Sequence, residues 1–110
     1  MKYIRTKDDI YKVVKEDGNW LEIISNFERK MQCHCVINKH AVIKQADTIE
    51  DLCDEFICVH KERDNKTIHK SYWFAMSVKE ECKQIYGAIW TDKGLIYIAK
   101  MNSKGELELL

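Results

Sequence analysis

The sequence predicts a β-rich α+β fold, in which antiparallel strands are combined with two short helices and a C-terminal three-stranded meander. Three observations lead to this fold class. The 110-residue chain contains no proline, turn signals interrupt it at short intervals, and two capping-box patterns mark the starts of helices. A chain of this length is expected to form one domain, here over residues 1–110.

Short antiparallel strands are expected in the N-terminal half of the chain. β-branched, aromatic and aliphatic residues fill positions 10–14 and 20–24, which is typical of strands. The residues between them include Asp17-Gly18-Asn19, and glycine and asparagine tolerate the positive φ of tight hairpin turns. Two further strands are predicted at 31–37 and 41–44.

The first helix is predicted over residues 48–56. A capping side chain at Asp47 or Thr48 is followed by acidic residues that suit the start of a helix. Ile49, Leu52 and Phe56 fall at positions i, i+3 and i+7, which places them on one face of a helix. We therefore expect this face to pack against a sheet.

The second helix is predicted from the capping-box sequence Ser77-Val78-Lys79-Glu80, with an apolar stripe formed by Val78, Cys82 and Ile85. The chain that follows alternates strand-forming segments with short loops that end in glycine. These segments predict a three-stranded antiparallel meander over 86–90, 95–101 and 106–110.

The charge balance argues against a general nucleic-acid binder. The chain carries 18 basic and 18 acidic side chains, whereas affinity for nucleic acid comes largely from phosphate neutralisation by excess basic residues. The N-terminal residues lack the apolar core of a secretory signal, and no apolar run reaches the length of a membrane span. A cytoplasmic protein with reduced cysteines and no membrane association is therefore expected.

A group of cysteines and histidines provides the candidate metal ligands. Residues two apart on a strand share a face, so Cys33 with Cys35, and Cys58 with His60, could together hold zinc. The same residue types could form a thiol nucleophile and its base, as Cys35 with His40 or Cys58 with His60. The alternative is that the cysteines pack in the core. Because the C-x-C spacing differs from common zinc motifs, we expect no metal. Since the sequence contains no G-x-S-x-G, P-loop or G-x-G-x-x-G motif, we also expect no cofactor and no enzymatic activity.

A run of three aromatic residues provides the candidate binding site. Tyr72, Trp73 and Phe74 are consecutive, so on a strand Trp73 would point away from the other two. An exposed aromatic face beside His69 and Lys70 would suit recognition of a partner. The alternative is that a sheet covers one face and a helix the other.

Four segments of the chain resemble a family of small uncharacterised proteins of phages and prophages from low-GC Gram-positive bacteria. They are residues 1–8 (MKYIRTKD), 42–56 (VIKQADTIEDLCDEF), 85–97 (IYGAIWTDKGLIY) and 106–110 (ELELL). The segments contain no catalytic motif, and the resemblance implies no set of functional residues. It implies a protein that acts in the cytosol of the host bacterium.

Together these features predict a non-enzymatic accessory protein that binds a host or phage protein, for example in host takeover or counter-defence. Self-association through exposed apolar residues is a further expectation. One alternative is a nucleic-acid or nucleotide-binding module that uses the aromatic run. The other alternative is a zinc-binding or thiol enzyme.

Overall fold

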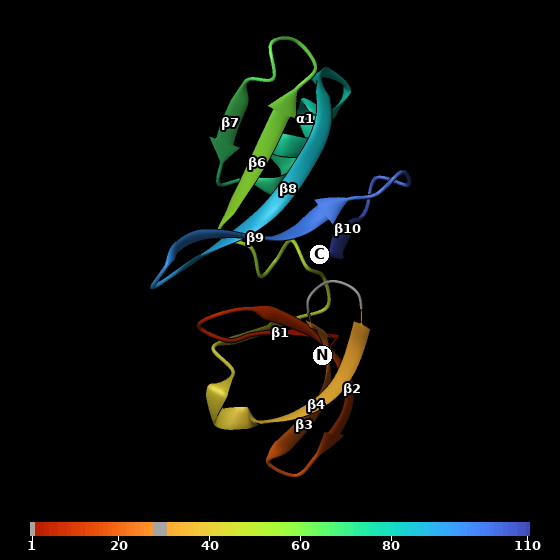
Figure 1. The fold of residues 1–110 in the computed structure, drawn as a ribbon, viewed down its shortest axis with the longest axis vertical. Coiled ribbons are helices and arrows are strands. Elements are labelled where there is room, and N and C mark those ends of the chain that lie inside the picture. The colour runs from red at the N-terminus through yellow and green to blue at the C-terminus, as the bar shows by residue number, and fades with distance from the viewer. Residues whose placement is uncertain (1, 28–30) are drawn as a thin grey trace. The chain divides into compact units, whose positions relative to one another are not determined.

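The computed structural model describes residues 2–27 and 31–110, together with their side chains except those of 25–27 and 31–34 (Figure 1). The chain divides into two compact units, Met1–Leu52 with Leu110 and Cys53–Leu109. Each unit is built on one five-stranded antiparallel sheet. That residues 1–110 form one domain stays a prediction.

The N-terminal unit contains a four-stranded meander whose first strand is also paired with a fifth. Its strands are β1 (Tyr3–Arg5), β2 (Ile10–Asp17), β3 (Trp20–Phe27), β4 (Met31–Asn38) and β5 (Lys44–Ala46), in the order β4-β3-β2-β1-β5. The predicted hairpin is confirmed, because β2 and β3 pair across a two-residue turn in which Gly18 has φ 58°. Ile4, Leu21 and Ile23 form the core of this sheet.

The C-terminal unit combines a sheet with a single α-helix on one face (Figure 1). Its elements are β6 (Glu55–His60), β7 (Lys66–His69), α1 (Tyr72–Ser77), β8 (Cys82–Thr91), β9 (Gly94–Met101) and β10 (Leu107–Leu109), and the strand order is β10-β9-β8-β6-β7. Phe56 and Cys58 of β6, Ile85 of β8 and Ala75 of α1 pack together in the core between helix and sheet.

The C-terminal meander predicted from turn residues is present. β8 pairs with β9 and β9 with β10, both antiparallel. Gly94 and Gly105 adopt φ 98° and 80°, the left-handed backbone conformation that glycine accepts without a steric cost. The loops that close the two hairpins therefore follow directly from the positions of these glycines.

The predicted fold class, α+β with two short helices, is wrong. Among the described residues the structure has ten strands in two antiparallel sheets and one α-helix, so the protein is mostly all-β. Residues 47–52 form bends and turns rather than a helix, and Phe56 lies on a strand. Ile49 and Leu52 are buried, but in a loop conformation.

The reason for the error at 48–56 is the position of β6 in the sheet. β6 pairs with β7 on one side and with β8 on the other, so the apolar run from Phe56 to Val59 is buried on both faces of a sheet. A helix of two turns is marginal without packing. The ladder hydrogen bonds and double-sided burial available to a central strand outweigh the local helical pattern.

The second predicted helix is also replaced by extended structure. Lys79–Glu81 forms one 3-10 turn, and the ten residues from Cys82 form the long strand β8 between β6 and β9. Cys82 and Ile85 are buried, as the pattern required, but on a strand whose pairing with β6 shifts register next to His60. Residues three apart on a regular strand point to opposite faces. The register shift allows Cys82 and Ile85 to pack on the same face, against Ala75 of α1.

Candidate functional site

The aromatic run, whose side-chain directions were considered above for a strand, lies on the α1 helix. Ser71 has an extended backbone and its Oγ accepts a hydrogen bond from the Phe74 N–H at 3.3 Å, which satisfies one of the unpaired donors of the first turn. Ser77 Oγ donates to the Phe74 carbonyl at 2.6 Å. A helix of six residues has little intrinsic stability, so its packing against the sheet must hold it in place.

The helical period separates the aromatic run into one anchor and two surface residues. The Tyr72 ring meets the buried Phe56 ring edge-on, with centroids 5.4 Å apart, and Ala75 is buried one turn later. Trp73 and Phe74 lie at the surface, with exposed fractions of 81% and 51%, and the Trp73 and Tyr72 rings meet edge to face with centroids 5.8 Å apart. Most of the tryptophan side chain therefore lies in solvent on an element whose other face is anchored in the core.

Hydrogen bonds among two histidines and a threonine lie beside the exposed aromatic residues. The Thr67 hydroxyl is 2.9 Å from His60 Nε2 and 2.8 Å from His69 Nε2, and the His69 ring packs against Phe74 with centroids 4.6 Å apart. Thr67 and His69 share a face because they are two apart on β7. The sequence analysis did not identify this pair, although the two-residue spacing of Thr67 and His69 is the signal that could have indicated it.

The charged residues from β7 to the end of α1 are all lysines, and the acidic Glu80 and Glu81 follow in the next turn. From Lys66 to Lys79 the chain contains three lysines and no aspartate or glutamate, and all three lysines are exposed. We call the surface formed by His69, Lys70, Trp73 and Phe74 the α1 surface. It combines exposed aromatic rings with a basic edge, within a chain whose formal net charge is zero.

The residues proposed as zinc ligands are distributed over both units of the structure. The side chain of Cys33 lies outside the described residues. Cys35 is an exposed thiol on β4 of the N-terminal unit, whereas Cys58 and His60 belong to β6. Among the side chains that the structure describes, no group of three or more candidate ligands is placed to hold a metal ion.

Cys58 is chemically unsuited to act as a nucleophile at neutral pH. Its side chain is fully buried, and burial, followed by the neighbouring Cys82 thiol, raises the pKa of Cys58 from an ordinary value of 9.0 to about 11. Cys82 Sγ in turn donates to the Val78 carbonyl at 3.3 Å. Since the thiolate is the reactive form, these two cysteines act as small apolar residues of the core.

We predict that alkylation will separate the cysteines by burial. In the native protein at pH 8, iodoacetamide should modify the exposed Cys35, while Cys58 and Cys82 should react only after unfolding in urea. Because folding raises the pKa of Cys58, the native state is favoured while that thiol is protonated, and this contribution is lost as the pH rises from 9 towards 11. Peptide mass mapping gives the readout, and equal rates for Cys35 and Cys58 would contradict the assignment.

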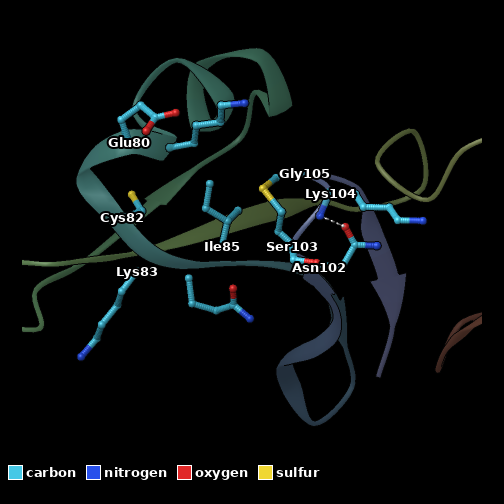
Figure 2. A pocket seen from close by; sticks show the side chains of 11 residues that line it. Glu80, Cys82, Lys83, Ile85, Asn102, Ser103, Lys104 and Gly105 are labelled. Carbon is cyan, nitrogen blue, oxygen red and sulfur yellow. Dashed lines mark hydrogen bonds between the residues drawn. The ribbon is translucent and has the colours of Figure 1, made fainter.

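The pockets of the C-terminal unit are lined by side chains of mixed charge. One of about 300 Å³ has Cys82, Ile85 and Met101 among its lining residues, with lysines and Glu80 around them. Figure 2 shows the Lys83 and Lys104 side chains extending in opposite directions from this pocket, and Lys83 forms an ion pair with Asp64. The lysines do not converge on one point, so this pocket lacks the arrangement needed to hold an anion.

A second pocket in this unit, of about 600 Å³, includes His60 and Thr67 in its lining. Lys61, Glu62 and Glu81 add charges of both signs. In the N-terminal unit a pocket of about 430 Å³ lies among Leu21, Val42 and neighbouring polar residues. These polar, mixed-charge linings differ from the mostly apolar linings typical of small-molecule sites, so the exposed aromatic α1 surface is the stronger candidate.

Comparison with protein-family models, curated proteins and solved structures found no match to this chain. In the part of the chain that the structure describes, no helix has both the length and the apolar character needed to cross a bilayer.

Proposed function

We propose that this protein is a non-enzymatic binding protein that uses the α1 surface to contact a protein partner. The observation that carries the proposal is the exposure of Trp73, 81% of which is in solvent beside the half-exposed Phe74. Tryptophan is among the residues most enriched at the energetic centres of protein interfaces. The resemblance of four sequence segments to small phage and prophage proteins suggests that the partner is a host or phage protein in the bacterial cytosol.

The energy available from Trp73 supports a role in binding. Aromatic side chains bury about 150–250 Å², and apolar area contributes roughly 25 cal/mol per Å², so covering this ring is worth several kcal/mol before the costs of association. Tyr72 packs on Phe56 and Ser71 caps the helix, and both contacts fix the backbone that carries Trp73. The backbone that carries the ring therefore has little conformational entropy left to lose on binding.

A nucleic-acid-binding module is the second candidate, because exposed aromatic rings beside lysines also suit single-stranded nucleic acid. Two observations favour a protein partner instead. One face of the Phe74 ring is already occupied by His69, which leaves Trp73 as the main stacking surface. The zero net charge of the chain also reduces the phosphate neutralisation on which affinity depends.

The proposal is tested by comparing three forms of the protein as affinity baits in a lysate of a low-GC Gram-positive bacterium. They are the wild type, Trp73→Ala, and Trp20→Ala, a matched control that removes a 51% exposed tryptophan from the N-terminal unit. A partner should be retained by the wild type and by Trp20→Ala. Its affinity for Trp73→Ala should be at least 30-fold weaker, since interface tryptophans commonly contribute about 2 kcal/mol or more.

Nuclease treatment separates the two candidates. Retention that survives nuclease and requires Trp73 supports the protein-binding role, whereas retention that disappears with nuclease favours the nucleic-acid role. Equal retention by wild type and Trp73→Ala would show that the α1 surface is not the binding site. The melting temperature of Trp73→Ala should stay close to the wild-type value, because an exposed side chain contributes little to stability.

A further inference from the structure

We propose, building on the protein-binding role of the α1 surface, that the partner docks as an acidic extended segment that adds a strand to the free edge of β7. Strand addition to a sheet edge is a common mode of peptide recognition, in which main-chain hydrogen bonds supply affinity and side chains supply specificity. The chemistry of β7 and of the residues after it determines the class of segment that would fit.

β7 has one open edge. Within residues 2–27 and 31–110, β6 is the one strand that pairs with β7, and β7 stands last in the order β10-β9-β8-β6-β7. The His60 N–H donates to the Asn65 carbonyl at 2.8 Å, so His60 and Asn65 form a hydrogen-bonded pair of the β6–β7 ladder. Because antiparallel pairs alternate between bonded and non-bonded positions, Thr67 and His69 bond to β6. The N–H and C=O groups of Lys66 and Ile68 therefore point outward.

The side chain of Ile68 also suits an added strand. Ile68 is 58% exposed, and it lies opposite the fully buried Ile57 in the register of β6 and β7. An added strand would place its own apolar side chain next to Ile68, on the face away from Thr67 and His69. This would extend an existing row of apolar cross-strand contacts by one residue.

The charges along the edge select an acidic occupant. Lys66 begins β7 and Lys70 follows its last residue, so the two lysines are separated by about 13 Å along an extended chain. No acidic residue lies between Lys66 and Lys79. Acidic residues spaced about four apart in the partner would meet both lysines, whereas a second β7 edge would bring lysines together and be repelled.

The edge also leads directly to the α1 surface. β7 ends at His69 and α1 begins at Tyr72, and the His69 ring packs on Phe74. A segment that runs along β7 and continues past Lys70 would therefore reach the exposed rings of Trp73 and Phe74. One acidic, extended partner segment would then use the main-chain, charged and aromatic features of this region together.

The experiment selects binders to the full-length protein from a display library of random 12-residue peptides. The proposal expects enriched sequences with at least two acidic residues and alternating apolar residues. A synthetic form of the best peptide is then measured by fluorescence anisotropy. N-methylation of its backbone amides one at a time should weaken binding at least tenfold at alternate positions and have little effect between them, because only alternate amides face β7.

Charge reversal supplies the second readout. The double variant Lys66→Glu/Lys70→Glu should bind the acidic peptide at least tenfold more weakly than the wild type does. The same variant should bind a peptide in which lysines replace the acidic residues. Lys93→Glu, an exposed lysine in the turn between β8 and β9, is the control and should bind as the wild type does. Failure to select a peptide, a basic consensus, or insensitivity to N-methylation would overturn strand addition.

Two further outcomes are distinguishable. If partner binding requires Trp73 but is unchanged by Lys66→Glu/Lys70→Glu, the α1 surface is the binding site and strand addition is wrong. If neither change affects the partner, both proposals fail. Self-association that is lost in the lysine double variant would assign the β7 edge to a second copy, with the acidic strand β10 as occupant, and would overturn the external partner.

Discussion

Replacing Phe56 with alanine is expected to lower the free energy of unfolding by about 3–5 kcal/mol. Phe56 is 2% exposed and lies on β6, between β7 and β8. Its ring contacts Tyr72 at the start of α1, so the substitution leaves a cavity and also removes the anchor of the helix. Urea denaturation followed by far-UV circular dichroism measures the change. Since small proteins have about 5–15 kcal/mol in total, the effect should be large.

Two variants control this measurement. Phe56→Leu keeps most of the apolar volume and should cost less than about 1.5 kcal/mol. Trp73→Ala also removes an aromatic ring from the α1 region but from its exposed side, and should change stability by no more than about 0.5 kcal/mol. A similar loss for Phe56→Ala and Trp73→Ala would contradict the assignment of inner and outer faces to the aromatic residues of this region.

Replacing Gly87 with alanine is expected to destabilise the protein by about 1–3 kcal/mol through overpacking. A Cβ atom on Gly87 would lie 2.7 Å from Cys53 Sγ and 3.6 Å from the Ala99 Cβ and Leu107 Cδ1 atoms. Gly87 lies on β8 beside a register shift in the pairing with β9, so neighbouring backbone cannot move away without disturbing the ladder. Thermal unfolding followed by circular dichroism gives the readout.

The sulfur of Cys53 makes this prediction specific. In the background of Cys53→Ala, the added methyl group at position 87 no longer meets a sulfur atom, so the double variant should be more stable than the sum of the two single changes. A coupling of about 0.5–3 kcal/mol is expected for side chains in contact. Strict additivity of the two substitutions would show that the close approach to Cys53 does not limit the site.

The hairpins were predictable because their signals are local. Gly18, Gly94 and Gly105 each adopt positive φ, and only residues at the turn itself determine that conformation. The alternation of Leu107 and Leu109 with glutamates also agrees with the paired strand β10. In the hairpin turns and β10 the local preference of the chain and its folded structure coincide, so the sequence pattern predicts the structure there.

The aromatic candidate site was predictable in composition but not in orientation. Tyr72, Trp73 and Phe74 were selected as binding residues because of their type, and their directions were considered only for a strand. On a helix, the 100° rotation between residues places Tyr72 against Phe56 and leaves Trp73 mostly exposed and Phe74 half-exposed. Thr67 and its contact with His69 were missed because β7 is a short edge strand with a weak sequence signal.

By itself the sequence determined the turns, the antiparallel C-terminal meander and the residue types of the candidate binding site. Tertiary structure decided the helices. At residues 48–56 and after Ser77, local patterns indicated helices, yet these segments contribute to the central strand β6, which is buried on both faces, and to its neighbour β8, on which Cys82 and Ile85 are buried. A capping box and an apolar stripe contribute a few tenths to about one kcal/mol each, whereas burying a single large apolar side chain contributes about 1.5–3 kcal/mol. Packing between distant segments therefore outweighed the local helical preference.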